Sequence, residues 1–443
     1  MWKIIVIFVC KFINKLSKLL GHEGSVIGGH YALKLDKNIL KKIELPKYVV
    51  GITGSSGKSS STELMYNILT KNNYTVCYNK EGSNTINGIT SMILNNCNFF
   101  GKVKKDILLM ELDEQFMKYI FEHITPTHLM ITNITRDQPP RNSHPEKIYN
   151  AIKGAIPEGT TLILNVDDPF VNRLRINHKG IKVSYGVSQN DYSIASKLHN
   201  LDACYCPICN SKLEYEFYHY GHIGSYQCPK YHFYRGTPQY EAKNVDVVNR
   251  RITINEKEVK LPSNFLYTVY FVTGCYALCK SLGLSDDEIL NVLNGDIKTK
   301  RLNIYKFNKR NWQMLASKNE NNLSYKQSLD YIVHEDGDKT IILGFDSSSR
   351  RYKENDISWI WDIDFEILKH DSIKNIILIG KFCYDLELRM KYANIEDDKI
   401  ILVPDLKDLA KIIKKKTKGN IYSMVCFDKE IQLKNIIKEE QKW

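Results

Sequence analysis

The sequence lacks several features that would place the protein in other classes. Its apolar run Ile4–Cys10 is far shorter than the roughly 20 residues that a membrane-spanning helix needs. There is no internal repeat and no low-complexity segment, which excludes repeat and fibrous architectures. No basic helix and no aromatic-basic motif occurs, which argues against nucleic acid binding. No cysteine lies in the sequence setting of a catalytic nucleophile.

The composition is that of a globular protein with an excess of positive charge. Its 443 residues suggest two or three domains, each large enough for its own core. The net charge of +12 would suit an anionic partner, such as a nucleotide, a pyrophosphate lipid or an acidic membrane surface. Apolar strand-like runs alternate with helical stretches, which predicts an α/β fold.

The first twenty residues have the pattern of an amphipathic helix. Lys3 and the apolar run after it resemble part of a signal peptide, but lysines follow in place of a small-residue cleavage site. We therefore expect a cytoplasmic protein. The helix either packs on the protein's own core or lies on a membrane surface, as a peripheral contact. The residues predicted to share one helical face are Phe8, Phe12, Leu16, Leu19 and Leu20.

The segment 51–60, with the sequence GITGSSGKSS, has the pattern of a loop that holds a nucleotide triphosphate. An apolar run precedes it and helical spacing follows, which predicts a strand, a tight turn and a helix whose N-terminus faces the phosphates. Lys58 would meet the β- and γ-phosphates, and the Ser59 hydroxyl suits Mg²⁺. Because Ile52 replaces the first glycine of the strict pattern, a Gly/Ser-rich surface loop is the alternative. The predicted nucleotide-binding residues of this loop are Gly54, Ser55, Gly57, Lys58, Ser59 and Ser60.

Three later segments each combine an apolar strand with polar residues at its end: 108–114, 131–137 and 162–169. In open parallel sheets, ligands gather at the carboxyl ends of the strands. An acid after a strand is by itself more often part of a turn or a helix cap, so any one segment is a weak signal. The phosphate loop followed by all three segments in this order is a strong signal of a nucleotide-binding domain.

With these segments, Thr53–Ser59 resembles the ATP loop of the Mur ligase superfamily, which activates a carboxylate as an acyl phosphate and couples it to an amine. The resemblance implies a Mur-ligase-like central P-loop domain that uses ATP and Mg²⁺, with Lys58 and Glu111 as catalytic residues and Glu111 and Ser59 as magnesium ligands. It further implies nucleotide contacts from Asn165, Asp168 and Arg301. For Arg301, the alternative is a solvated arginine in a basic linker.

A narrower resemblance is to the MurT family, the Mur-ligase-type subunits of lipid II isoglutaminyl synthase. It is carried by Tyr78–Asn84, by Arg136-Asp137-Gln138 and by the tryptophan motif Ser358–Glu366. It implies amidation of the D-glutamate α-carboxylate of lipid II to D-isoglutamine, with ammonia supplied by a separate GatD-type glutaminase subunit. It also implies that Asp356 assists the partner's Cys-His pair, although a helix N-cap is the alternative for this residue.

The cysteine pattern near residue 206 predicts a structural zinc ribbon inserted in the central domain. A C-x-x-C pair is followed at ribbon spacing by Cys228. Tyr231 stands where the family has a cysteine, so the fourth ligand would be His232, or Cys204 or another residue. The alternative is a ribbon without metal that is held together by aromatic packing. The preferred zinc ligands are Cys206, Cys209, Cys228 and His232.

We expect an N-terminal helical segment over residues 1–44 and an ATP-binding domain over 45–305, with the ribbon at about 203–236. Within the ATP-binding domain, helices are predicted at 267–282 and 285–293. Three apolar runs (340–344, 375–380 and 399–403) then predict a smaller Rossmann-like domain over 310–443.

Two other functions stay open at this point. The chain could be a divergent Mur-type ligase that joins an amino acid, in place of ammonia, to a carboxylate. It could also be an ATP-binding scaffold without turnover, although retention of Lys58 and Glu111 argues against that.

Overall fold

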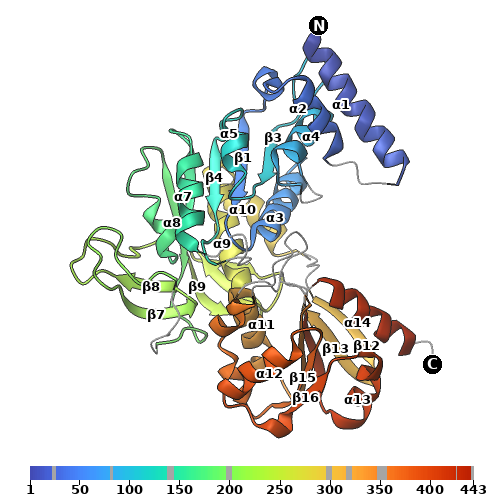
Figure 1. The fold of residues 1–443 in the computed structure, drawn as a ribbon. Helices are drawn as coiled ribbons and strands as arrows, with labels where there is room; N and C mark the ends of the chain where they lie inside the picture. Colours follow the sequence, from blue (N-terminus) through green and yellow to red (C-terminus); the bar gives the residue numbers. More distant parts are fainter. Residues whose placement is uncertain are drawn as a thin grey trace. The chain divides into compact units, whose positions relative to one another are not determined.

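The computed structural model describes residues 1–21, 26–79, 83–136, 144–195, 202–295, 302–315, 322–346, 357–425 and 427–440. The chain divides into two compact units (Figure 1). The first comprises residues 1–135 and 145–297, and the second comprises residues 136–144 and 298–443.

The first unit is built on a sheet that has nine strands within the described residues, in the order β11-β10-β9-β6-β5-β4-β1-β3-β2. The strands from β2 to β9 in this order pair in parallel, whereas β9, β10 and β11 pair antiparallel. The strands are β1 (Tyr48–Thr53), β2 (Val76–Tyr78), β3 (Ile107–Glu111), β4 (His128–Ile131), β5 (Thr161–Asn165), β6 (Lys182–Val187), β9 (Tyr240–Asp246), β10 (Arg251–Ile254) and β11 (Lys257–Lys260).

Helices cover both faces of the parallel strands, which is why these strands are apolar almost without interruption. One face packs on α4 (Ile86–Asn96), α5 (Met117–Phe121), α7 (Pro145–Ala155) and α8 (Pro169–Arg173), with a core that includes Leu108, Leu129 and Leu162. The other face packs on α3 (Lys58–Lys71) and α9 (Leu266–Ser281), with α10 (Asp286–Leu293) beside α3.

The close approach of α9 to the sheet depends on a glycine. A Cβ atom on Gly274 would lie 2.3 Å from the Met130 side chain and 2.9 Å from the Tyr185 ring. The predicted helices at 267–282 and 285–293 are α9 and α10, and Ser285 forms the N-cap of α10 in a capping box with Glu288. Both helix predictions are confirmed.

The predicted amphipathic helix is α1 (Trp2–Leu19), which lies beside α2 (Ile27–Leu35) at the periphery of the first unit (Figure 1). The helix packs on the protein core, but the apolar residues predicted to share one helical face do not make this contact. The side chains that it buries are Val6, Ile7, Cys10, Asn14 and Ser17. Asn14 fixes the two helices together, since its Oδ1 accepts a hydrogen bond from the Gly28 amide at 3.0 Å.

The predicted face of α1 is instead exposed to solvent: Phe8 is 55% exposed, Phe12 57% and Leu19 76%. Among the helices of the described ranges, none combines the length and the hydropathy that a membrane crossing requires.

Between β6 and β9 the chain forms a separate antiparallel hairpin of β7 (Glu214–Tyr220) and β8 (Ile223–Gln227). It falls in the segment where the ribbon is predicted. Its small core contains Cys206, Leu213, Tyr226, Cys228 and Phe233. The hairpin is tied to the main sheet, because the Gly224 amide donates to the Asp167 carbonyl oxygen at 2.9 Å.

The second unit has its own sheet, which within the described residues has six strands in the order β12-β13-β17-β14-β15-β16. The predicted apolar runs are three of them, and all strands from β13 to β16 in this order are parallel. The strands are β12 (Leu302–Phe307), β13 (Arg310–Leu315), β14 (Lys339–Gly344), β15 (Ile373–Ile379), β16 (Ile400–Val403) and β17 (Asn420–Val425). The α-helices are α11 (Asn322–His334), α12 (Cys383–Tyr392), α13 (Leu409–Lys416) and α14 (Phe427–Glu440).

The two tryptophans of the tryptophan motif have different environments. Trp359 is buried between the rings of Phe345 and Tyr325, at centroid distances of 5.2 and 5.4 Å. Trp361 is partly exposed and meets the Tyr392 ring edge-on at 5.2 Å. One tryptophan therefore belongs to the core of the second unit, and the other contributes to its surface.

Candidate nucleotide site and cysteine cluster

The phosphate loop (residues 53–59) joins the end of β1 to the start of α3, as the sequence predicts. Its shape requires glycine at Gly54, which has φ +130°. A Cβ atom there would lie 2.2 Å from the Thr132 hydroxyl oxygen and 2.8 Å from the Asn133 carbonyl oxygen. Gly57 also has positive φ (+82°), but a Cβ atom on it would meet no atom within 4 Å.

Residues that follow β4 hold the phosphate loop from behind. Asn133 accepts hydrogen bonds through its carbonyl oxygen from the Ser55 amide at 2.8 Å and through Oδ1 from the Ser56 amide at 3.0 Å. The Thr132 hydroxyl donates to the Ser56 carbonyl oxygen at 2.7 Å. The sequence indicated this segment but not these two residues; their signal is a polar pair directly after a buried strand.

Lys58 is buried and turns back toward its own loop. Its ammonium group donates to the carbonyl oxygens of Gly54 and Ser55 and forms an ion pair with Glu114. Glu114 is the last residue of the segment 108–114, and the sequence predicts no role for this position. Because phosphate oxygens would compete with these partners, Lys58 can change partners when a nucleotide binds.

Ser59 and Glu111 are the predicted magnesium ligands, and the fold brings them together. The Ser59 hydroxyl donates to Glu111 Oε1 at 2.9 Å. Asn79 fixes Glu111, since it accepts from the Glu111 amide at 2.9 Å and donates to its carbonyl oxygen at 3.0 Å. A hydroxyl and a carboxylate oxygen at the start of a helix are the oxygen donors that Mg²⁺ prefers. The residues present therefore fit this ion.

Asn165 and Asp168 lie at the carboxyl end of β5 and bond to the protein. Asn165 donates to the Thr132 carbonyl oxygen at 3.1 Å. Asp168 is fully buried, caps α8 by accepting from Phe170 and accepts from the Ile134 amide at 2.7 Å. Both residues thus support the backbone behind the phosphate loop, and their contact with a nucleotide stays a prediction.

Asp168 also faces a buried histidine on the hairpin. His222 Nε2 lies 3.4 Å from Asp168 Oδ1, and His222 Nδ1 lies 3.9 Å from Asp202 Oδ2. Burial alone would lower the pKa of His222, but the charges of Asp168 and Asp202 outweigh it and raise the pKa above its ordinary value. Arg301 and Asp356, the two other predicted site residues, lie outside the described residues.

The cysteine cluster, which comprises Cys206, Cys209 and Cys228, brings together three sulfur atoms within 4.8 Å of one another. The Sγ atoms of Cys206 and Cys228 accept hydrogen bonds from backbone amides two residues later, each at 3.4 Å. The pKa of the Cys209 thiol is lowered to about 6, chiefly by its hydrogen bond to the Ser211 hydroxyl. Three converging sulfur atoms, two of which accept amide hydrogen bonds, suit Zn²⁺, so these three residues fit a structural zinc ion.

Two residues beside the cysteine cluster, Tyr231 and His232, are exposed to solvent. Tyr231, which replaces the family's cysteine, is 71% exposed and has φ +57°. It therefore forms the turn between β8 and the next chain segment, with its ring in solvent. His232, the preferred fourth ligand, is exposed beside Tyr231 and is not one of the three residues whose ligand atoms converge, so its binding to zinc stays a prediction.

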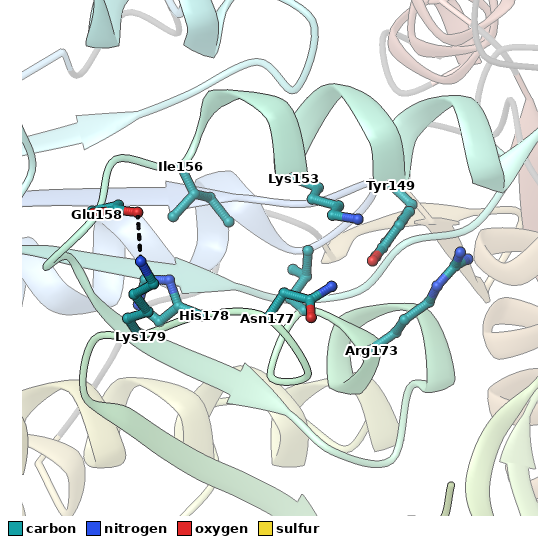
Figure 2. A pocket seen from close by; sticks show the side chains of 9 residues that line it. Tyr149, Lys153, Ile156, Glu158, Arg173, Asn177, His178 and Lys179 are labelled. Carbon is teal, nitrogen blue, oxygen red and sulfur yellow. Dashed lines mark hydrogen bonds and ion pairs between the residues drawn. The ribbon is translucent and has the colours of Figure 1, made fainter. Parts of the chain in front are cut away.

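A small pocket of about 150 Å³ lies elsewhere on the first unit (Figure 2). The Arg173 guanidinium stacks on the Tyr149 ring there, at 4.2 Å from the ring centroid. The other walls of the pocket come from α7, which contributes Lys153, and from the loops that lead into β5 and β6, which contribute Glu158 and His178. These loops are at the amino ends of the strands, whereas the phosphate loop is at the carboxyl ends. The pocket is therefore no part of the phosphate-loop site.

Two protein-family models match this chain: the Mur ligase middle domain over residues 52–227 and the MurT ligase C-terminal domain over residues 318–428. The chain is 30% identical over 393 residues to the MurT subunit of lipid II isoglutaminyl synthase (glutamine-hydrolyzing) from Staphylococcus aureus strain COL, and the match covers 88% of each protein. The chain belongs to the MurT family. It is 25% identical over 429 residues to the MurT subunit from Streptococcus pneumoniae R6, with 95% and 93% covered.

Solved structures of Mur ligases share the fold of this MurT-family chain. A pseudomurein peptide ligase type C from Methanothermus fervidus matches with a TM-score of 0.69 and 22% identity, over 91% of this chain and 80% of that one. MurF from Thermotoga maritima, solved in complex with ADP, matches with a TM-score of 0.60 and 16% identity, over 94% and 84%. The Mur-ligase-like α/β fold is therefore confirmed, and family membership makes the chain an ATP-dependent ligase of peptidoglycan biosynthesis.

Proposed function

We propose that this chain is the synthetase subunit of an amidotransferase that converts the D-glutamate of lipid II to D-isoglutamine. The γ-phosphate of ATP passes to an oxygen of the α-carboxylate, which gives an acyl phosphate and ADP. Ammonia then attacks the acyl carbon, phosphate leaves, and the nitrogen loses a proton to give the amide. The observation that carries the proposal is the Ser59–Glu111 contact beside the phosphate loop, in a chain whose relatives are named as subunits of this synthase.

The residues of the site would act mainly by positioning and by neutralising charge. Backbone amides of the loop would face the phosphates, and Lys58 would leave Glu114 for the β- and γ-phosphates. Ser59 and Glu111 would hold Mg²⁺, which when bound supplies positive charge at the phosphates. Arg301, which lies outside the described residues, would contact the nucleotide phosphates, as the family resemblance implies.

The relatives are named as subunits, which supports a second chain in the enzyme. We propose that this partner is a GatD-type glutaminase that supplies the ammonia, and that Asp356 assists its Cys-His pair. The parallel sheet of the second unit supports a Rossmann-like C-terminal domain, and we propose that this domain contacts the partner. The lipid-linked acceptor further supports a location at the inner face of the membrane.

We also propose that the cysteine cluster binds a structural zinc ion, with His232 as the fourth ligand. The convergence of three thiols and the amide hydrogen bonds to two of them support this. The ion would cross-link the hairpin, and no step of the reaction would depend on it.

The experiment that tests the function measures ATP hydrolysis and amide formation on lipid II, with ammonium chloride in place of the partner. Wild type should form the amide and Lys58→Ala should not, whereas Lys71→Ala, at the exposed end of the same helix, should behave as wild type. ATP turnover without amidated lipid II would instead indicate a ligase for another amine or carboxylate. No turnover with any amine would favour a nucleotide-binding scaffold.

A further inference from the structure

Helix α1 presents its most apolar side to solvent and its more polar side to the protein. The inward face carries Cys10, Asn14 and Ser17 besides Val6 and Ile7. The outward face repeats at spacings of three and four residues, as expected for one side of a helix, and all its members are exposed. We define the outward face as Ile5, Phe8, Phe12, Leu16 and Leu19.

This arrangement is the reverse of what core packing produces, because a surface helix normally turns its apolar stripe inward. The buried hydrogen bond from the Gly28 amide to Asn14 fixes the rotation of α1 about its axis. The exposed stripe is thus a consequence of the packing itself. It extends along a helix of 18 residues, or about 27 Å at 1.5 Å per residue.

A neighbouring turn enlarges the apolar surface. Phe99 and Phe100 follow α4 and are 48% and 77% exposed. Lys11 of α1 ties this turn to the helix, since its ammonium group donates to the Cys97 carbonyl oxygen at 2.7 Å and lies 5.6 Å from the Phe99 ring centroid. The two phenylalanines therefore lie beside α1.

The charges of α1 indicate which partner this surface suits. The helix contains four lysines and no acidic residue, and Lys15 and Lys18 are exposed next to the apolar stripe. Protein interfaces are depleted in lysine, whereas helices that lie on bilayers combine Trp, Phe and Leu with lysines that reach anionic headgroups. No described helix can cross a membrane, so a helix that lies in the membrane plane is the geometry that remains for such a contact.

We propose that the outward face of α1 and the Phe99–Phe100 turn dock this protein on an anionic lipid bilayer. The inference deepens the proposed function, because a lipid-linked acceptor would be met at that surface. The evidence for the docking proposal is the exposed apolar face, however, and the proposal can be tested without any substrate.

The experiment is co-sedimentation of the full chain with vesicles that contain neither lipid II nor ATP. Wild type should bind vesicles of phosphatidylglycerol and phosphatidylcholine. The variant Phe8→Ser/Phe12→Ser/Leu19→Ser should bind at least about tenfold more weakly, because three apolar side chains no longer enter the bilayer. Its fold should persist, since all three are exposed. Val248→Ser, which removes an exposed apolar side chain elsewhere on the first unit, should bind as wild type.

Two double variants, each of which removes two lysine charges, test the preference for anionic lipid. Lys15→Gln/Lys18→Gln should lose most of the difference between anionic vesicles and pure phosphatidylcholine vesicles. Lys415→Gln/Lys416→Gln, which removes the same charge from exposed positions of α13, should retain it. Wild-type binding to neither vesicle, or equal binding by the triple variant, would overturn the proposal. So would a wild-type dimer that the triple variant dissociates without any vesicle binding. Amidation of a soluble acceptor by the triple variant would show that the catalytic proposal stands independently.

Discussion

Lys58 and Glu114 form an ion pair in which the two side chains are only 9% and 2% exposed. The pair connects the phosphate loop to the segment that follows β3. We propose that a nucleotide phosphate competes with the Glu114 carboxylate for this buried cation, which would link nucleotide binding to the stability of the site.

Glu114→Ala should therefore make folding more dependent on nucleotide. Breaking a buried pair costs up to about 3–5 kcal/mol, reduced here because Lys58 keeps its two carbonyl partners. We expect a lower melting temperature without ATP, and a larger increase on adding Mg-ATP than in wild type, since phosphate replaces the lost carboxylate. Glu158→Ala, which removes an exposed pair with Lys179, is the control. Equal ATP-induced shifts in both variants would contradict the partner exchange.

Glu111→Gln should raise the Mg²⁺ concentration required for half-maximal ATP hydrolysis by at least about tenfold, because an amide is a weaker ligand than a carboxylate. Asn79→Ala should produce a smaller shift, since Asn79 fixes only the backbone of Glu111. Glu122→Gln changes an exposed acid in the same region and should leave the Mg²⁺ dependence unchanged. A Mg²⁺ titration of the three variants decides the matter; an unchanged Glu111→Gln profile would remove this residue from the metal site.

The two glycines of the phosphate loop should respond differently to alanine. Gly54→Ala should cost about 3 kcal/mol or more, since it adds both positive-φ strain and a clash with Thr132. Gly57→Ala should cost only about 1–2 kcal/mol, because its Cβ would meet open space. Urea unfolding of the two variants measures the difference. A larger loss at Gly57 would mean that the loop conformation is not the one described.

Removal of zinc should destabilise the hairpin. Metal analysis should find one zinc ion per chain in wild type, and a chelator should lower the melting temperature. Cys228→Ser and His232→Ala should each reduce the zinc content. Cys204→Ser should retain the ion, because His232 is the proposed fourth ligand; Cys204 and His232 both lie outside the three residues that converge. Loss of zinc in Cys204→Ser but not in His232→Ala would make Cys204 the fourth ligand.

His222 should make stability depend on pH. Its pKa is higher in the folded state than its ordinary value of 6.5, so its contribution is fully present below that value and is lost as the pH rises through the folded-state pKa. The stability lost in His222→Gln should therefore be larger at pH 6 than at pH 8.5. Burial lowers the pKa of His128, so His128→Gln should show the opposite trend. Unfolding curves at the two pH values that show parallel trends would contradict the assignment.

Several local predictions from the sequence are confirmed because the physics involved is short-range. The strand, turn and helix around Lys58 follow from apolar runs and glycines within a few residues. The N-cap at Ser285 follows from the acid three residues later. The meeting of Ser59 and Glu111 was also predictable, since both follow parallel strands whose carboxyl ends share one edge of the sheet.

Other relationships depend on residues far apart in the chain. The apolar pattern of α1 leaves open whether its stripe packs on the protein core or lies on a membrane surface. The position of α2 and the hydrogen bond from the Gly28 amide to Asn14 turn that stripe outward. Nothing near Glu114 in sequence indicates that its partner is Lys58, 56 residues earlier. The sequence allows either a nucleotide contact or a helix cap for Asp168; the structure shows the cap on α8, and the hydrogen bond that Asp168 accepts from the distant Ile134 amide could not be predicted.

The family, the phosphate loop, the order of strands and helices and the three converging cysteines could all be predicted from local patterns of glycine, cysteine, apolar spacing and charge. The side of α1 that faces solvent and the carboxylate that pairs with Lys58 depend instead on tertiary packing. Side-chain direction depends on what packs against an element, and those neighbours are brought together only when distant segments bury their apolar surfaces in one core.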